Sequence, residues 1–284
     1  MRNQPALKII SLTGAALFCL LAVTQNARSQ QAGAASDQNK TAIAAPAPRH
    51  DISGTWMPVG DAQAMQDRGV AVATNPIPFT PYGLQVYKSH HPTAGPDGVV
   101  PDQSNDPRDK CEPPGMPRAD LYQLRQTQIL QDQYKIAILY QYTTRWRVIW
   151  IDGRELPKLI DGGVMAGREA RESRYYGYSV GRWADDTTLV IDTVGLIGDG
   201  RAWLDNAGRP LSDHMHVTET LHRVDHDRLE WSVTIDDPQM YSKTWTAMDK
   251  FPMKLQDPHT DVMEQYCSLT DMEQYNKSFG YPTK

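Results

Sequence analysis

The stretch DHMHVTETLHRVDHDRLEWSVTID, residues 213–236, contains two segments of alternating character joined by a short polar turn. In its first half, the alternate positions from Met215 to Arg223 are apolar except for Glu219 and Arg223, and the positions between them carry histidines and threonines. In its second half, Leu, Trp, Val and Ile recur at every second position. Successive side chains of a strand face opposite sides of the sheet. The stretch therefore predicts strands over residues 213–224 and 228–236, joined as a hairpin.

Shorter alternating segments extend this pattern over most of the chain after residue 119. Turn signals such as Asp152-Gly153 and Asp185-Asp186 separate them. Many short strands with hairpin turns indicate a mainly β fold, an antiparallel barrel or sandwich, with one or two short helices. The further strands are expected over residues 134–142, 144–151, 176–184, 187–193, 243–247, 251–255 and 262–267, and the helices over residues 80–90 and 270–275.

The N-terminal residues have the layout of a secretory signal peptide. Arg2 and Lys8 precede an apolar run over residues 9–23. This run is shorter than the roughly 20 residues that span a bilayer. Ala27-Arg28-Ser29 then provides a small-x-small cleavage site. We expect a signal peptide over residues 1–29 and a periplasmic or secreted protein. The alternative is a retained membrane anchor.

The rest of the chain divides into a leader and one domain. Residues 30–49 are rich in Ala, Gln and Pro without periodicity, which predicts a disordered leader. Residues 50–284 are expected to form a single β-rich domain.

The charge balance argues against polyanionic partners. Cleavage after residue 29 removes three basic residues and no acidic one, so the formal net charge falls from −5 to −8. Neither nucleic acid nor, after cleavage, an anionic membrane is an expected partner. Motifs for nucleotide cofactors or a complete zinc site are missing from the sequence, and no cofactor is expected. The sequence gives no indication of the oligomeric state.

Two cysteines, Cys111 and Cys267, follow the signal segment. In an oxidising compartment an isolated pair is more often bridged than free. We expect a disulfide that ties a Pro-rich loop to the C-terminal region. The alternative is two separate buried thiols.

The hairpin carries the candidates for acid/base chemistry. Glu219 shares a face with apolar residues, so burial makes it either a general acid or base or the partner of a buried arginine such as Arg145, Arg147 or Arg223. His216 faces the other side, where it could transfer protons together with Asp152 or Tyr178. His214 and His216 could also share a metal ion, with a third ligand from another strand, either Asp152, Asp192 or Glu230. A polar face without a metal is the favoured alternative.

Arginines and aromatic residues are the candidates for ligand binding. Arg145, Arg147 and Arg154 could anchor an anionic group through their planar guanidinium groups. The aromatic residues could either stack against a ring-shaped or saccharide ligand or belong to the core. The candidates are Tyr178 and the tryptophans Trp146, Trp150, Trp183, Trp203, Trp231 and Trp245.

Several motifs resemble those of a large family of secreted bacterial proteins with no settled activity. They are WRVIWIDGRELP at 146–157, YGYSVGRW at 176–183, DTTLVIDTVG at 186–195, HVTE at 216–219 and TIDDP at 234–238. The resemblance spans roughly residues 51–269 and implies a β-rich, lipocalin-like fold. It implies no particular reaction.

Two functional hypotheses follow. The first is an exported barrel that binds a small organic or saccharide ligand in an aromatic-lined cavity. The second is a cofactor-free acid/base enzyme, a lyase, isomerase or hydrolase, that uses His216 or Glu219 with an arginine to anchor an anionic group.

Overall fold

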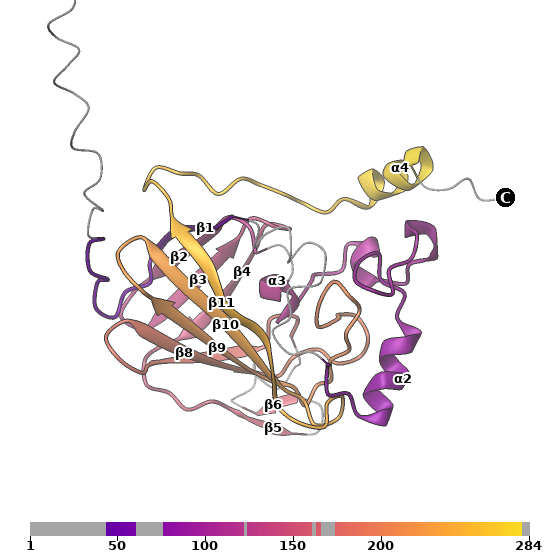
Figure 1. Cartoon of the computed structure of the whole chain (residues 1–284), viewed down its shortest axis with the longest axis horizontal. Coiled ribbons are helices and arrows are strands. Elements are labelled where there is room, and N and C mark those ends of the chain that lie inside the picture. Colours follow the sequence, from indigo (N-terminus) through magenta and orange to yellow (C-terminus); the bar gives the residue numbers. More distant parts are fainter. Residues whose placement is uncertain (1–43, 61–75, 122–123, 161–162, 166–173, 280–284) are drawn as a thin grey trace, which may run out of the picture. The chain divides into compact units, whose positions relative to one another are not determined.

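The described residues form a closed, mainly β barrel (Figure 1). The structure is a computed structural model that describes residues 44–60, 76–121, 124–160, 163–165 and 174–279. The predicted signal peptide lies outside these residues. The barrel strands are β1 (Gly54–Pro58), β2 (Thr127–Gln131), β3 (Lys135–Tyr140), β4 (Arg145–Trp150), β7 (Tyr178–Trp183), β8 (Thr188–Val194), β9 (His216–Arg223), β10 (Arg228–Asp236) and β11 (Trp245–Leu255), in the spatial order β1-β11-β10-β9-β8-β7-β4-β3-β2.

The predicted hairpin is confirmed as β9 and β10, which pair antiparallel from Arg223 opposite Leu229 to His216 opposite Asp236. Burial alternates along β9, so that Glu219 and its apolar neighbours face the barrel interior. The histidine-bearing face of β9 lies outside the barrel. The interior is filled by large side chains, and Trp56 and Trp231 are fully buried there.

The prediction of a wholly antiparallel sheet is wrong at one seam. β4 and β7 pair in parallel, with Ile149 opposite Ser179 and Trp150 opposite Val180. A parallel pair needs a long crossover, and residues 151–177 provide it, including the separate two-stranded sheet of β5 (Lys158–Ile160) and β6 (Gly163–Met165). In the described pairing, the first part of β4 therefore borders the segment that precedes β7 instead of a strand.

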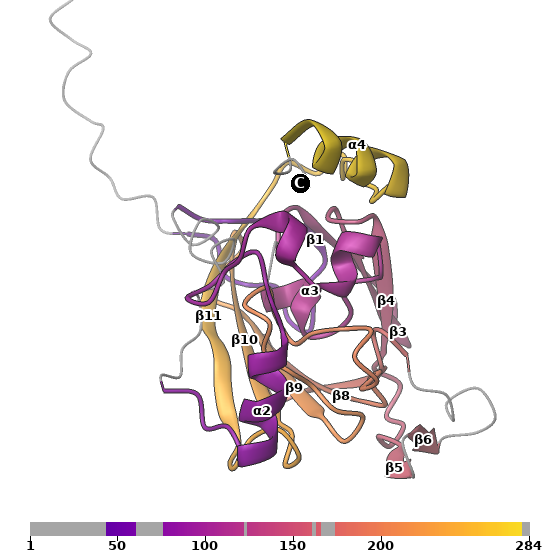
Figure 2. The same cartoon turned by 90° about the vertical axis from the view of Figure 1, so that its right-hand side faces the viewer.

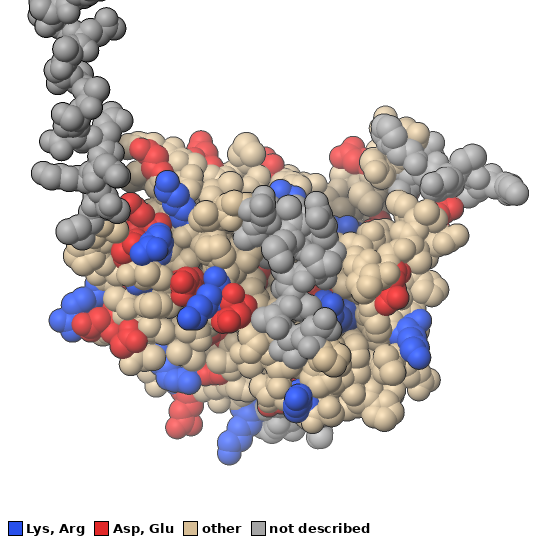
Figure 3. Space-filling model, in the orientation of Figure 1, with Lys and Arg blue, Asp and Glu red and all other residues tan. Residues whose placement is uncertain are grey.

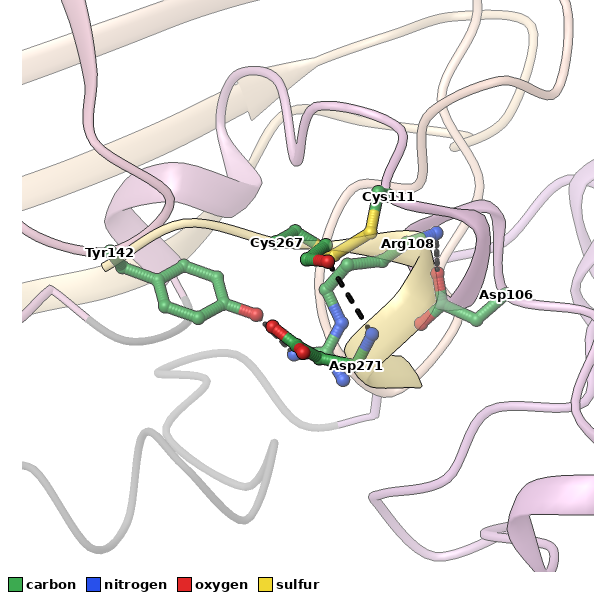
Figure 4. The surroundings of a disulfide bond; sticks show 7 residues. Asp106, Arg108, Cys111, Tyr142, Cys267 and Asp271 are labelled. Carbon is green, nitrogen blue, oxygen red and sulfur yellow. Dashed lines mark hydrogen bonds between the residues drawn. A yellow bond between two sulfur atoms is a disulfide. The ribbon is translucent and has the colours of Figure 1, made fainter. Parts of the chain in front are cut away.

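The C-terminal third departs from the predicted strands in two places. The two strands predicted over residues 243–247 and 251–255 are one strand, β11, which begins at Trp245. Its register against β10 shifts near Lys250, which adopts a φ of 47° and donates its N–H to Ser232 Oγ at 2.9 Å. Residues 262–267 are not a strand. They belong to an extended arm that the expected disulfide Cys111–Cys267 attaches to the rest of the molecule (Figure 4).

Both predicted helices are present, together with shorter ones. α2 (Pro81–Ser89) begins after Thr80, whose Oγ1 accepts the N–H of Gly83 at 2.9 Å. No described helix is long and apolar enough to cross a membrane. Two views show α2 and α3 on one side of the barrel (Figures 1 and 2). The remaining helical segments are η1 (Pro101–Gln103), η2 (Pro107–Lys110), α3 (Arg118–Leu121) and α4 (Leu269–Phe279).

The end of the predicted leader contacts the barrel. The carbonyl of Ala45 accepts the N–H of His226 at 2.8 Å, and Arg49 forms a salt bridge with Asp186 at 2.8 Å. The described, barrel-bound part of the chain thus begins before residue 50.

Candidate functional site

A cavity of about 580 Å³ lies at the seam between β4 and the segment that leads into β7. It is open to solvent, because Trp146, which lines it, is 67 % exposed. The cavity exists because the pairing of β4 with β7 starts only at Ile149. The described residues that line it are Pro113, Lys135, Arg145, Trp146, Arg147, Val148, Trp150, Arg174, Tyr175, Tyr176, Gly177, Tyr178 and Ser179.

Several residues that the sequence singled out for ligand binding meet at this cavity. Arg145, Arg147, Trp150 and Tyr178 all line it, although they come from two strands that are separated by the long crossover. Trp146, another tryptophan that the sequence offered for stacking, also lines the cavity, on the same outer face of β4 as Trp150.

Arg154 holds two of these aromatic side chains in place. Its guanidinium carbon lies 3.6 Å from the centroid of the Trp150 ring, and its Nη1 donates to Tyr178 Oη at 2.9 Å. Its Nη2 donates to the Asp152 carboxylate at 2.7 Å. Asp152 is therefore engaged with Arg154, and the structure does not bring it to His216.

All charged side chains among the described lining residues are cationic, namely Lys135, Arg145, Arg147 and Arg174. Neither Lys135 nor Arg145 forms a salt bridge with a carboxylate of the described residues. The cavity thus combines aromatic rings with positive charge.

Behind this cavity, Glu219 is in an ion pair and not on an open surface. Arg147 Nη2 donates to Glu219 Oε1 at 2.6 Å, and both side chains are almost completely buried. The indole N–H of Trp231 donates to the same oxygen at 3.1 Å. Of the alternatives that the sequence left open for Glu219, the structure shows a buried pair with Arg147.

A second carboxylate, Asp120, completes this buried cluster. Its Oδ1 accepts the hydroxyl of Tyr140 at 3.0 Å, and its Oδ2 lies 3.9 Å from Arg147 Nη2. Burial, and then the negative charge of nearby Glu219, hold the pKa of Asp120 well above its ordinary value of 3.8. Burial therefore favours the protonated, neutral form of Asp120. This residue lies in a short helix after a Pro-rich loop, and no local sequence pattern marks it.

On the outer face, His216 pairs with Asp192, a residue that the sequence left open only as a third ligand of a metal ion. Its Nε2 lies 2.9 Å from Asp192 Oδ1, which also accepts the hydroxyl of Thr218 at 2.9 Å. Hydrogen bonds from His216, Arg182 and Thr218 hold the pKa of Asp192 below its ordinary value. Such a pair can transfer protons, but among the described residues no serine or cysteine side chain is hydrogen-bonded to His216.

Among the described residues, the structure brings together no set of ligands for the metal ion that His214 and His216 could share. His214 lies 3.6 Å from Asp213, on the exposed side of the chain. The part of the chain that the structure describes contains no group of three or more His, Cys, Asp or Glu side chains that could hold a metal ion.

The remaining tryptophans lie away from the cavity. Trp183 stacks on His50 with 5.0 Å between ring centroids, and Trp203 stacks on His90 at 4.4 Å. Trp203 and Trp231 are both buried. The expectation that they line a ligand cavity is not met in this structure, because both belong to packed regions.

No family model, curated protein or solved structure matches this chain. The resemblance to a family of secreted proteins thus remains an expectation, and the geometry of the cavity is the basis for assigning a function.

Proposed function

We propose that this protein is an exported barrel that binds a small, ring-containing organic molecule in the cavity beside β4. The volume of about 580 Å³ falls within the range of small-molecule sites. The family resemblance and the N-terminal sequence support export, and the disulfide Cys111–Cys267 fits an oxidising compartment.

The observation that carries the proposal is the aromatic lining of an open cavity. Trp146, Trp150 and Tyr178 line it together, and Trp146 is 67 % exposed. A ring that stacks on Trp146 removes apolar surface of both partners from water, which is favourable by roughly 25 cal/mol per Å². Arg154 covers Trp150 and restrains Tyr178, so these walls need little ordering when a ligand binds.

The acid/base alternative has less support from the geometry. Glu219 is completely buried and paired with Arg147. His216 lies on β9, whereas Tyr178 at the cavity lies on β7, with β8 between them. Two strand spacings correspond to roughly 10 Å, which is beyond direct proton transfer to a molecule stacked on Trp146.

Binding of ring compounds to the purified protein tests the proposal. We would titrate naphthalene-2-carboxylate, its neutral carboxamide and naphthalen-2-ylmethylammonium, and follow heat and tryptophan fluorescence. At least one compound should bind in a 1:1 complex, and Trp146→Ala should weaken its binding at least about tenfold, as expected for the loss of a main stacking partner.

The matched control is Tyr82→Ala, which removes another exposed aromatic side chain, on α2 and outside the cavity lining. It should leave binding unchanged. If none of the three compounds binds, or if Trp146→Ala binds as well as the unaltered protein, the proposed function is wrong.

A further inference from the structure

We infer that the cavity selects organic anions, so that its ligand carries a carboxylate or a comparable negative group beside its ring. This inference rests on the proposed function and specifies the chemical class of the ligand. It depends on where the charges lie around the cavity.

The cavity differs in charge from the protein as a whole. The chain has a formal net charge of −5, and acidic and basic side chains lie side by side on the face drawn in Figure 3. The charged lining residues that the structure describes are nevertheless all basic. Lys135 and Arg145 lie on neighbouring strands, β3 and β4, and neither is neutralised by a salt bridge with a described carboxylate.

Carboxylates near this lining already have other partners. Asp152 accepts three hydrogen bonds from the side chain of Arg154. Glu112 accepts the hydroxyl of Tyr175. Glu219 is paired with Arg147 in the interior. None of these acids is among the described lining residues, so an anion in the cavity meets cations first.

Arg147, although it is one of the lining residues, adds no free charge to the cavity. Its side chain is 2 % exposed and paired with Glu219, and its Nε and Nη1 atoms are closed off from solvent. The proposed anion selectivity therefore depends on the exposed cations of the lining, above all Lys135 and Arg145, which form no salt bridge with a described carboxylate.

The naphthalene pair separates charge from ring stacking, because the carboxylate and the carboxamide have nearly the same shape. At low ionic strength the carboxylate should bind at least about tenfold more tightly than the carboxamide, and added salt should reduce this ratio because salt screens exposed charges. Arg145→Gln should weaken binding of the carboxylate several-fold and leave the carboxamide unchanged.

Lys243→Gln is the matched control. It also removes one exposed positive charge, but in the loop between β10 and β11, on strands that do not line the cavity. It should change neither affinity. The inference is overturned if the carboxylate and the carboxamide bind equally well, or if Arg145→Gln leaves the affinity for the carboxylate unchanged. In either case, binding of both compounds would still support the proposed function.

Discussion

Arg147, Glu219 and Asp120 form a buried cluster in which two carboxylates face one guanidinium. Taking charges out of water is costly, so a buried cluster is most stable when its charges cancel. With Asp120 protonated, Arg147 and Glu219 cancel, and the neutral acid still accepts a hydrogen bond from Tyr140. One bound proton therefore makes the cluster compatible with the barrel interior.

Replacing Arg147 should destabilise the folded protein far more than replacing Asp120. Arg147→Met leaves two buried carboxyl groups without their cation, and we expect it to lower the free energy of unfolding by about 3–5 kcal/mol. Asp120→Asn keeps the shape and an acceptor for Tyr140, and should cost less than about 1 kcal/mol at pH 7. Urea unfolding with the disulfide intact measures both. Similar losses for the two variants would show that Asp120 is charged in the folded protein.

The same proton predicts how stability depends on pH. The folded-state pKa of Asp120 is raised by burial, so between about pH 4 and that raised pKa the folded protein keeps a proton that the unfolded chain releases. The stability that Asp120 contributes, compared with the Asp120→Asn variant, is therefore at its full value below about pH 4. It should be lost as pH rises, by up to ~1.4 kcal/mol per pH unit.

Urea unfolding of the protein and the Asp120→Asn variant from pH 4 to pH 8 tests this dependence. The difference between the two free energies should shrink or reverse as pH rises. Two parallel curves across this range would mean that Asp120 has an ordinary pKa.

At the residue scale, the alternation of side chains along β9 predicts which face carries Glu219, but it does not predict contacts that depend on the placement of other elements. It placed Glu219 on the apolar face of β9 and named Arg147 among its partners, because period-two patterns fix which side a residue faces. It could not find Asp120, since the contact of α3 with the barrel depends on the path of a Pro-rich loop. Nor could it pair His216 with Asp192, which required the register of β8 against β9.

At the scale of elements, the strands that carry strong alternation were predicted closely. The parallel pairing of β4 with β7 was not predicted. Only two residue pairs join these strands, and their parallel direction follows from the crossover between them, which has no local sequence signature. The seam between these strands makes the cavity. The arm after β11 was also missed, because a few alternating residues fit a strand whether or not a partner strand is available.

Helix α2 depends on the close approach of Gly83 to the backbone of Met240. A Cβ atom at Gly83 would lie 2.0 Å from the Met240 carbonyl oxygen, so an alanine there forces the helix away from the turn that it packs against. Despite a gain in helix propensity of up to ~1 kcal/mol, we expect Gly83→Ala to lower the free energy of unfolding by about 1–3 kcal/mol.

Gln85→Ala is the matched control on α2, since Gln85 is exposed in the same helix. It should stay within about 0.5 kcal/mol of the unaltered protein. Thermal and urea unfolding of both variants checks the expectation. A Gly83→Ala variant as stable as Gln85→Ala would mean that α2 can shift at no cost.

At the scale of the whole molecule, the barrel and the disulfide were predicted from global properties. Many alternating segments with few helices indicated a closed or layered β fold, and an isolated cysteine pair behind a predicted signal peptide indicated a bridge. The sequence does not predict which surface forms a site, because the cavity brings together residues from β3, β4 and the segment before β7. Such combinations depend on tertiary structure alone.

The disulfide Cys111–Cys267 holds the C-terminal arm and α4 against the barrel. It closes a loop over a sequence separation of 156 residues, next to the Arg108–Tyr142 hydrogen bond (Figure 4). The arm also forms hydrogen bonds with the barrel region, from Gln265 N–H to Thr144 Oγ1 at 2.9 Å and from Met263 N–H to Gln126 Oε1 at 3.3 Å. A helix as short as α4 is marginal by itself in water. We therefore expect α4 to lose its structure when the bridge is removed, while the barrel stays folded.

The double variant Cys111→Ser/Cys267→Ser tests this expectation. Hydrogen exchange should show that the amides of α4 lose protection, whereas those of β9 and β10 keep it under native conditions. The free energy of unfolding should fall by about 2–5 kcal/mol, because the unfolded chain is no longer cross-linked. Reductant should have no effect on the double variant and should reproduce its exchange pattern in the unaltered protein. Protected α4 amides in the double variant would show instead that non-covalent contacts hold the arm.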